Sequence, residues 1–299
     1  MAEAQQSSKV HLAIPAISPP STAFAVAKEK GYYREESLEV EMIVIPAARA
    51  VQALIGGNVE FASVGGAALA PTLRGAPLRT VYSTFYRPQY WVYAKSDIRS
   101  IAELKGKKVG VSSLGSGPDF LLRDLLKTHG LEGGREVVIL PMGSGVQVFY
   151  AMQAGAVDAA ILSIPGNILA QESGFRELVS FIKQDQVEFH GSIVLRTPLL
   201  ESSPILVEKF VRGTLKGLLH LRSNRAGTVS ILGRFMKIKE DRAAHIYDLI
   251  LPGATQDGTV SEEFQKKSIE HIVNRLELKQ VPPLARKDLR LLTDPPAAS

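Results

Sequence analysis

The chain has 299 residues, of which 45% are hydrophobic and 22% are charged, the ordinary balance of a globular protein with buried cores. It contains no cysteine, which excludes disulfides, thiolate metal sites and a cysteine nucleophile. The formal net charge of +5 is not gathered into Lys and Arg runs among aromatic residues, which argues against nucleic-acid binding, and no stretch approaches the 18 or so consecutive apolar residues of a membrane-spanning helix.

The N-terminal segment MAEAQQSSKV is polar and has no apolar core of a signal peptide. We interpret it as a mature N-terminus to which an initiator Met was added after removal of a signal peptide. Residues 9–64 then alternate strand and helix patterns. The expected elements are a strand at 9–14, a helix at 23–30, a strand at 38–45, a short Ala-rich helix ending at Gly57 and a strand at 59–64.

The same order returns about a hundred residues later. QALIGGNVEFASV and AMQAGAVDAAIL match at a constant offset of 98 positions, which aligns Glu60 with Asp158. Each second strand is also followed by a proline, Pro46 or Pro141. The expected elements of this copy are a strand at 107–112, a helix at 118–129, a strand at 135–140, an Ala-rich helix ending at Gly155 and a strand at 157–162.

The C-terminal third predicts amphipathic helices that cover a core. In the segment 203–223, Ser203 is the expected cap and a set of apolar side chains is expected to face inward: Leu206, Phe210, Leu215, Leu218 and Leu219. Residues 261–278 predict another such helix, and TDPPAAS at the end predicts a flexible tail.

Two β-α-β-α-β units predict two α/β lobes, each with a parallel sheet. Ligands of parallel sheets bind beyond the carboxyl ends of the strands. Small and polar loops stand at those positions: Ser18–Thr22, Ser63–Ala67, Ser113–Gly117 and Ser163–Asn167. Each loop alone is also explained by turn and capping chemistry, but loops in both copies favour a ligand site. Two of them lead into helix N-termini, which favour an anion or a polar oxygen.

Motifs for catalysis are missing from the sequence. The histidines show no zinc-ligand spacing: His11, His129, His190, His220, His245 and His271. There is no GxSxG motif and no phosphate-binding GxxxxGK motif. Glu60 and Asp158 are expected at strand starts, away from the ligand loops, which argues against acid–base work. We therefore expect no enzyme activity, no metal and no cofactor.

Four segments together resemble the solute-binding proteins of ABC importers, in the nitrate/sulfonate/taurine branch that also includes binding proteins for thiamine pyrimidine precursors. They are AKEKGYYREESLEVEM, ALIGGNVEFASVGG, IRSIAELKGKKVGVSSLGSGPDFLLRDLLKTHGL and AMQAGAVDAAILSIP. The resemblance covers about 9–247. It implies the type 2 periplasmic binding fold, in which two Rossmann-like α/β lobes are joined by two hinge crossings, here YSTFYRPQYWVYAK and IKQDQVEFHGSIVL.

By this resemblance, residues 9–88 with 192–299 form lobe 1, residues 89–191 form lobe 2, and 1–8 and 294–299 are flexible tails. Ligand would lie in a cleft between the lobes. Tyr86 is expected either in a core strand or in the wall of this cleft, and His190 either in a structural role or at the ligand. The ligand-binding residues expected are Ser18, Pro20, Ser21, Thr22, Gly65, Gly66, Ala67, Tyr86, Ser113, Gly115, Ser116, Gly117, Ser163, Ile164, Pro165 and His190.

One departure bears on the ligand. Some sulfonate and nitrate binders carry an acidic or aromatic residue where this chain reads SVGGA and LSIPG. The smaller, more apolar loops favour an organic ligand, aromatic or heterocyclic and with some anionic character, over an inorganic anion. The resemblance implies a periplasmic monomer that delivers this solute to an ABC permease. Two alternatives remain: an enzyme on the same scaffold, of a dehydratase or pyrimidine-precursor type, and a sensor domain for a signalling partner.

Overall fold

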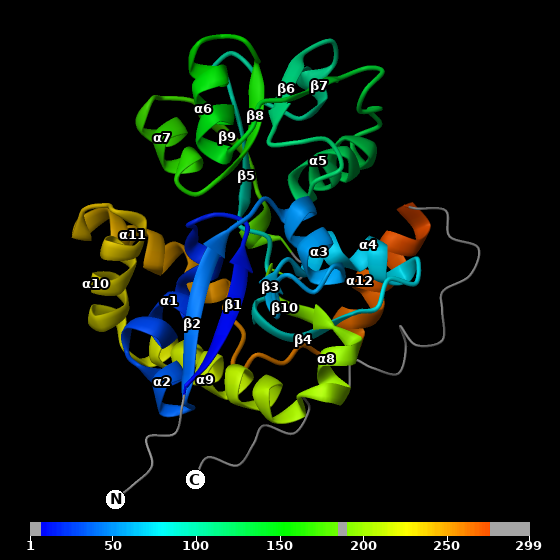
Figure 1. Cartoon of the computed structure of the whole chain (residues 1–299). Helices are drawn as coiled ribbons and strands as arrows, with labels where there is room; N and C mark the ends of the chain where they lie inside the picture. The colour runs from blue at the N-terminus through cyan, green and yellow to red at the C-terminus, as the bar shows by residue number, and fades with distance from the viewer. Residues whose placement is uncertain (1–6, 185–189, 276–299) are drawn as a thin grey trace, which may run out of the picture. The chain divides into compact units, whose positions relative to one another are not determined.

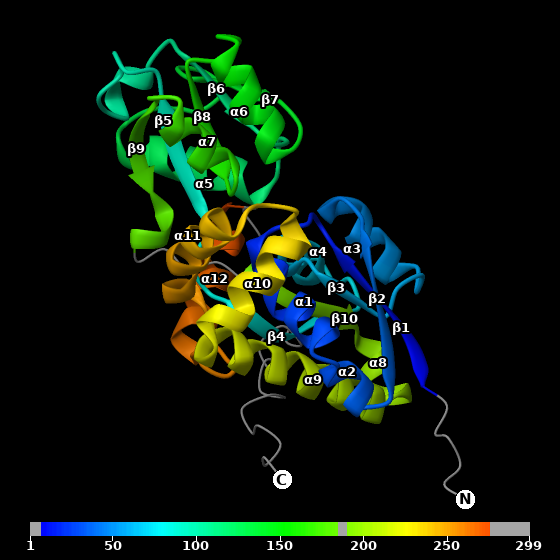
Figure 2. The ribbon, with the colours of Figure 1, turned by 90° about the vertical axis from the view of Figure 1, so that its left-hand side faces the viewer.

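The computed structural model describes residues 7–184 and 190–275. Contacts between Cα atoms divide the chain into two units, Met1–Arg87 with Val187–Ser299 (unit 1) and Pro88–Gln186 (unit 2). Figures 1 and 2 show both. Pro88, expected in lobe 1, therefore belongs to unit 2, and His190 and Gly191, expected in lobe 2, belong to unit 1. Part of the second expected crossing, 185–189, and the expected tail 294–299 lie outside the described residues. Ser8, expected in the N-terminal tail, instead opens the first strand.

Unit 1 contains a five-stranded sheet in the order β2-β1-β3-β10-β4. Its strands are β1 (Ser8–Ile14), β2 (Leu38–Val44), β3 (Phe61–Ser63), β4 (Leu78–Phe85) and β10 (His190–Arg196). The helices are α1 (Thr22–Glu29), α2 (Tyr32–Glu35), α3 (Ala47–Ile55), α4 (Gly65–Leu73), α8 (Thr197–Ser202), α9 (Pro204–Ser223), α10 (Arg225–Met236), α11 (Glu240–Ile250) and α12 (Glu262–Arg275), with short 3₁₀ turns η1 (Pro19–Ser21) and η4 (Leu251–Gly253).

Helices cover both faces of this sheet. Ala50, Val51 and Leu54 of α3 pack with alternate strand residues such as Ala13 and Ala62. Helices α1, α2 and α9 lie side by side (Figure 2) and pack against the opposite face, where the rings of Phe61 and Phe210 stack at 3.9 Å. No helix of the described residues is long and apolar enough to cross a membrane.

Unit 2 repeats this plan with the strand order β7-β6-β8-β5-β9. Its strands are β5 (Tyr90–Ala94), β6 (Lys108–Val111), β7 (Val138–Pro141), β8 (Ala159–Ser163) and β9 (Arg176–Ser180). Its helices are α5 (Gly117–Thr128), α6 (Gly145–Gln153) and α7 (Gly166–Glu172), with 3₁₀ turns η2 (Ala102–Leu104) and η3 (Phe181–Lys183). The leucines of α5 pack on the face that carries Val92, Val109 and Ile161. Helices α6 and α7 lie on the other face, where Val148 of α6 approaches Gly110.

Neither sheet is wholly parallel, contrary to the expectation from the strand–helix alternation. In each unit three consecutive strands are parallel, β2-β1-β3 and β7-β6-β8. The fourth strand, β10 or β5, is antiparallel to both of its neighbours. These two strands lie outside the repeated segments, so the repeat could not predict their direction.

The register also corrects the alignment of the two copies. Leu12 pairs with Phe61 as Val109 pairs with Ala159, so the first strands are 97 positions apart and the third strands 98. The extra residue lies before α6. Pro141 ends β7, whereas Pro46 immediately precedes α3, so the two prolines do not correspond.

Helix α9 begins at the expected place, but two details differ. Ser203 makes no capping hydrogen bond with its side chain. Leu219, expected inward, is 47% exposed. The buried stripe instead runs through Val207, Phe210, Val211, Thr214, Leu218 and Leu221, a set with spacings of one, three and four residues that keeps one helix face inward.

Candidate binding edges of the two sheets

In unit 1 the expected ligand residues gather at one edge of the sheet. Strands β1 and β3 both end at this edge, and so does β4 because two antiparallel pairings separate it from β3. Strand β10 begins there. This topology brings together Ser18–Thr22 after β1, Gly65–Ala67 after β3, Tyr86 after β4 and His190 at the start of β10.

The first loop of this edge holds its hydroxyl groups inward. The fully buried Thr22 hydroxyl donates to the Pro19 carbonyl at 2.7 Å, and Ser21 Oγ lies 3.5 Å from the Ala16 carbonyl. Pro20 is tied to the sheet because its carbonyl accepts from Thr84 Oγ1 at 3.4 Å. Ser18 is half-buried, so the loop presents Ser18 and backbone groups more readily than Ser21 or Thr22.

Gly65, Gly66 and Ala67 form the first turn of α4. No side chain caps this N-terminus, and the turn contains no acidic residue. Gly66 is half-buried and Ala67 is exposed. The backbone amides here are therefore available for a polar oxygen, and the helix dipole adds a partial positive charge.

Tyr86 and His190 are both half-buried. Tyr86 is anchored through its backbone N–H, which donates to the Gly253 carbonyl at 3.0 Å, and the Arg87 guanidinium carbon lies 5.6 Å from the centre of its ring. His190 pairs with Phe85 across β10 and β4. The edge thus combines an aromatic ring, an imidazole and a helix N-terminus.

In unit 2 the expected residues again share one edge, at the ends of β6 and β8. Ser113 and Gly115 are exposed, Gly117 begins α5, and the Ser116 hydroxyl donates to the Ser113 carbonyl at 2.6 Å. On the neighbouring strand, Ser163 ends β8. It is followed by Ile164, which is buried, and by the half-buried Pro165, which precedes α7.

The N-terminus of α5 already holds a carboxylate of the chain itself. Asp119 is 2% exposed; its Oδ2 accepts from the Gly115 backbone N–H at 2.8 Å, and its Oδ1 accepts from Arg123 Nε at 2.9 Å. The Gly115 N–H is therefore occupied by a carboxylate of the Asp119–Arg123 ion pair and is not free for an external anion. The carboxylate of Asp119 thus takes the place in which the sequence predicted an external anion or polar oxygen beside Ser113–Gly117. Asp119 stands in the first turn of α5, in the segment GPDF, and could have indicated this from the sequence.

Buried polar side chains that the motif analysis did not select lie at the same edge. Gln89 directly precedes β5, Ser180 ends β9, and Asn167 lies in the first turn of α7; they are 2%, 8% and 3% exposed. Polar atoms of all three have no hydrogen-bond partner in the protein. Neither Gln89 nor Ser180 belongs to a recognisable motif, so only the strand pairing reveals their place.

Glu60 and Asp158 lie at the opposite edges of the two sheets, as expected. Glu60 Oε2 accepts from the His11 backbone N–H at 2.7 Å. Asp158 accepts from the Lys108 backbone N–H at 3.0 Å and from Lys95 Nζ at 2.7 Å, and the hydrogen bond from Lys95 is the main cause that lowers the pKa of the Asp158 carboxyl. Both carboxylates have structural partners here, away from the candidate edges.

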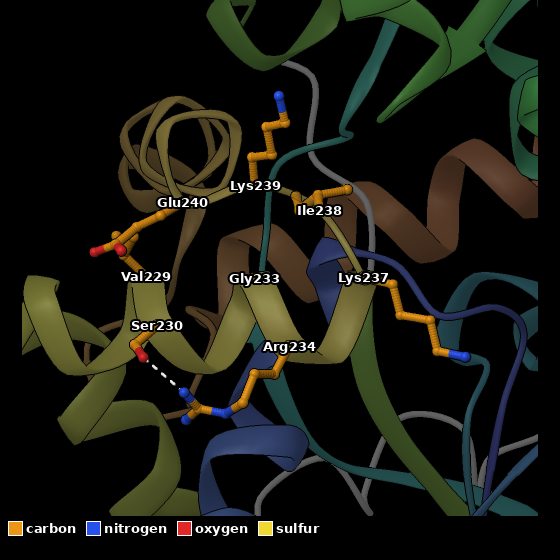
Figure 3. Close-up of a pocket in the computed structure, with 8 residues that line it drawn as sticks. All are labelled: Val229, Ser230, Gly233, Arg234, Lys237, Ile238, Lys239 and Glu240. Carbon is orange, nitrogen blue, oxygen red and sulfur yellow. Dashed lines mark hydrogen bonds between the residues drawn. The ribbon is translucent and has the colours of Figure 1, made fainter.

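The described side chains include no group of three or more His, Asp or Glu residues that could hold a metal ion. A shallow surface hollow lies elsewhere in unit 1, between the end of α10 and the start of α11 (Figure 3), and contains none of the expected residues. Arg234 in this hollow donates to Ser230 Oγ at 2.7 Å and pairs with Glu29. It is a basic patch of the surface and not part of the candidate edges.

Comparison with known proteins decides the family. The model of a family described as NMT1/THI5 like matches residues 18–225. The chain belongs to the NMT1/THI5-like family. A Brucella abortus (strain 2308) protein named "Putative binding protein" is 28% identical over 221 residues, which are 72% of this chain and 67% of that protein.

One more sequence relative and one solved structure are similar to the NMT1/THI5-like chain. A Haemophilus influenzae "Putative thiamine biosynthesis protein" is 33% identical over 150 residues, 48% of this chain and 46% of that protein. The crystal structure of the periplasmic aliphatic sulphonate binding protein SsuA from Escherichia coli matches with a TM-score of 0.74 at 21% identity, over 93% of this chain and 91% of SsuA. The chain therefore has the periplasmic binding protein fold, and the resemblance stated from its sequence is confirmed.

Proposed function

We propose that this chain is an extracytoplasmic solute-binding protein that captures a small organic solute and delivers it to an ABC importer. The observation that carries the proposal is that the small-residue loops lie at one edge of each sheet. The chain belongs to the NMT1/THI5-like family and shares its fold with the sulphonate-binding protein SsuA. Backbone amides at α4 and uncommitted polar groups at the edge of unit 2 suit a ligand that is held without covalent chemistry.

Native mass spectrometry of the full chain, purified without refolding, tests this proposal. A retained solute should appear as a mass above that of the polypeptide and should be released on denaturation. A thermal-shift screen against aromatic carboxylates, sulfonates and pyrimidines then finds its class. Absence of a retained mass together with no shift from any probe would contradict solute binding.

An enzyme on this fold is the second candidate, favoured by the name of the Haemophilus relative. Three carboxylates argue against it, because Asp119 is bonded to Arg123 and both Glu60 and Asp158 lie at the edges away from the candidate loops. Incubation of the released solute with fresh protein, followed by mass spectrometry, separates the two functions. Conversion of the solute would favour the enzyme, and its recovery unchanged would favour transport.

A further inference from the structure

A segment of unit 1 that the motif analysis did not select lies along the outer edge of β4. Strand β4 is the last strand in the order of its sheet, next to β10. Residues 253–258 (the strap) cover its other side. Phe85 and Ala254 form an antiparallel bridge, and the Ser83 backbone N–H donates to the Gly258 carbonyl at 2.9 Å. The strap therefore satisfies backbone groups that an edge strand would otherwise leave open.

The hydroxyl of Thr255 ties the strap to β4. The Thr255 residue is 3% exposed. Its Oγ1 donates to the Ser83 carbonyl at 2.6 Å and accepts from the Gly258 backbone N–H at 3.2 Å. The Thr255 backbone N–H donates to the Thr84 carbonyl at 2.9 Å. One buried residue thus bonds both to the strand and to the far end of the strap.

Two further contacts fix the place of the strap. Arg222 of α9 reaches it through Nη1, which donates to the Ala254 and Thr255 carbonyls at 3.1 and 3.3 Å. Gly258 has φ +88°, and a Cβ there would overlap the buried ring of Tyr82. Both the backbone conformation and this close approach require glycine. The strap is therefore held by hydrogen bonds from α9 and by close packing on β4.

The first residue of the strap holds Tyr86. The Tyr86 backbone N–H donates to the Gly253 carbonyl at 3.0 Å, and Tyr86 Oη lies 3.5 Å from the Pro252 carbonyl oxygen. Tyr86 is the candidate ligand residue after β4, and the chain enters unit 2 two residues later, at Pro88. The strap thus fixes the backbone of a candidate binding residue at the point where the chain leaves β4.

From these contacts we infer that Thr255 is a positioning residue for solute binding. Its side chain is buried and its hydroxyl is used by β4 and the strap, so it acts through Tyr86 and not by touching solute. The strap holds Tyr86 in place before the solute arrives, which lowers the cost of ordering the site on binding. The inference rests on the proposed function and adds to it a residue that prepares the site.

Hydrogen exchange of the solute-free full chain, followed by NMR, tests whether Thr255 holds Tyr86. Thr255→Val removes the hydroxyl and leaves a side chain of similar shape. The Tyr86 amide exchanges through local opening of the strap, so its rate should rise at least about tenfold, the factor that corresponds to one good hydrogen bond. Thr255→Ser restores the hydroxyl and should keep the wild-type rate.

Thr214→Val is the matched control. It removes another fully buried hydroxyl of unit 1, which donates to the Phe210 carbonyl on α9 at 2.9 Å. It should lower the melting temperature but leave the Tyr86 amide rate unchanged. Arg222→Met removes both bonds of Arg222 to the strap and is the second variant if Thr255→Val fails to fold. It should change the Tyr86 amide rate in the same direction as Thr255→Val.

Solute affinity tests whether this positioning serves binding. The probe is the solute released from the wild-type chain on denaturation, added back to solute-free variants and followed by native mass spectrometry. Thr255→Val should bind it at least about threefold more weakly, the factor expected if only a third of the chains keep the strap in place. Thr255→Ser and Thr214→Val should bind it like wild type.

The outcomes separate this inference from the function itself. If Thr255→Val and Arg222→Met keep the wild-type exchange rate at Tyr86, the strap does not hold Tyr86, and the inference is overturned while solute binding stands. If the rate rises but the affinity does not fall, Thr255 has only a structural role, which also overturns the inference. If the wild-type chain retains no solute, the proposed function fails, and the inference fails with it even where the amide rates change.

Discussion

Glu60 and Asp158 occupy equivalent positions in the two copies and make the same kind of hydrogen bond. Each carboxylate accepts from the backbone N–H of the neighbouring first strand, His11 in unit 1 and Lys108 in unit 2. Sequence similarity alone presented them as a pair without a role. The bonds show that each one joins the start of a third strand to the first strand, which explains an acidic residue at this position in both copies.

The substitution Asp158→Asn should lower the free energy of unfolding by about 0.5–1.5 kcal/mol at neutral pH, since it removes a partly exposed ion pair. The lowered pKa of the Asp158 carboxyl means that its contribution is complete above the unfolded pKa of about 3.9 and is lost as pH falls through the folded pKa. Urea unfolding at several pH values measures this. The difference from wild type should shrink below about pH 4, and Asp97→Asn, on an exposed turn, should show no such difference.

Gly115 separates backbone strain from ligand contact. Its φ is +74°, and a Cβ there would meet no atom within 4 Å; Gly106 has φ +75° and the same open space. Gly115→Leu and Gly106→Leu should each cost about 1–2 kcal/mol of stability through the left-handed backbone. Only Gly115→Leu should weaken solute binding, because Gly106 precedes β6 at the opposite edge. Equal affinities for the two variants would remove Gly115 from the site.

The sequence predicted which loops lie at the candidate edges, but it gave no signal for the buried polar atoms beside those loops in unit 2, and the reason is physical. Small-residue loops after strands are local signals, so Ser18–Thr22 and Ser113–Gly117 could be placed at sheet edges from the repeat alone. Gln89 and Ser180 become neighbours of that edge only through β5, whose partners are remote in the chain. No local pattern specifies such pairing. Whether the sixteen expected residues contact ligand stays a prediction.

At the scale of elements, helix α9 packs on α1 at unusually short range. A Cβ on Gly217 would clash with the Ala23 carbonyl oxygen and lie 2.8 Å from Ala27 Cβ. Glycine therefore serves this contact, although it is a poor helix former.

Replacement of Gly217 by Ala tests that contact. Helix propensity alone would add up to about 1 kcal/mol, but the forced separation of α1 and α9 should dominate and cost about 1–3 kcal/mol. Ile205→Ala on the same helix, where the side chain is 68% exposed, should stay within about 0.5 kcal/mol. Thermal unfolding of the two variants compares them. A stabilised Gly217→Ala protein would show that the helices separate freely.

The sheet topology shows which strands the strand–helix alternation of the sequence could predict and which it could not. The alternation of strands and helices predicted β1 to β3 and β6 to β8 because each element follows from its own residues. The antiparallel strands β5 and β10 were expected only as hinge crossings, through the family resemblance. β5 follows the first copy in the chain but joins the sheet of unit 2, whereas β10 follows the second copy but lies between β3 and β4 in unit 1. Such pairing between remote segments has no local signal in the sequence.

At the scale of the whole molecule, the two units have the same strand order and direction when β2, β1, β3, β10 and β4 are set against β7, β6, β8, β5 and β9. Three helices of the repeats also correspond, α1 with α5, α3 with α6 and α4 with α7, whereas α9 to α12 extend unit 1 alone. A solute-binding protein built in this way should use equivalent edges of both units. The cleft itself remains a prediction.

Hydrogen exchange with and without the co-purified solute tests the use of both edges. Saturating solute should slow exchange at the amides of Gly65–Ala67 in unit 1 and of Ser113–Gly117 in unit 2, because a bound ligand covers these loops and hinders their opening to water. At 100 times its dissociation constant the solute should also add about 2.7 kcal/mol to the free energy of unfolding. Amides around Glu60 and Asp158, at the far edges, serve as internal controls and should change no more than this global stabilisation requires. Protection confined to one unit would mean that a single edge binds the solute. The two copies would then share their fold but not their role in binding.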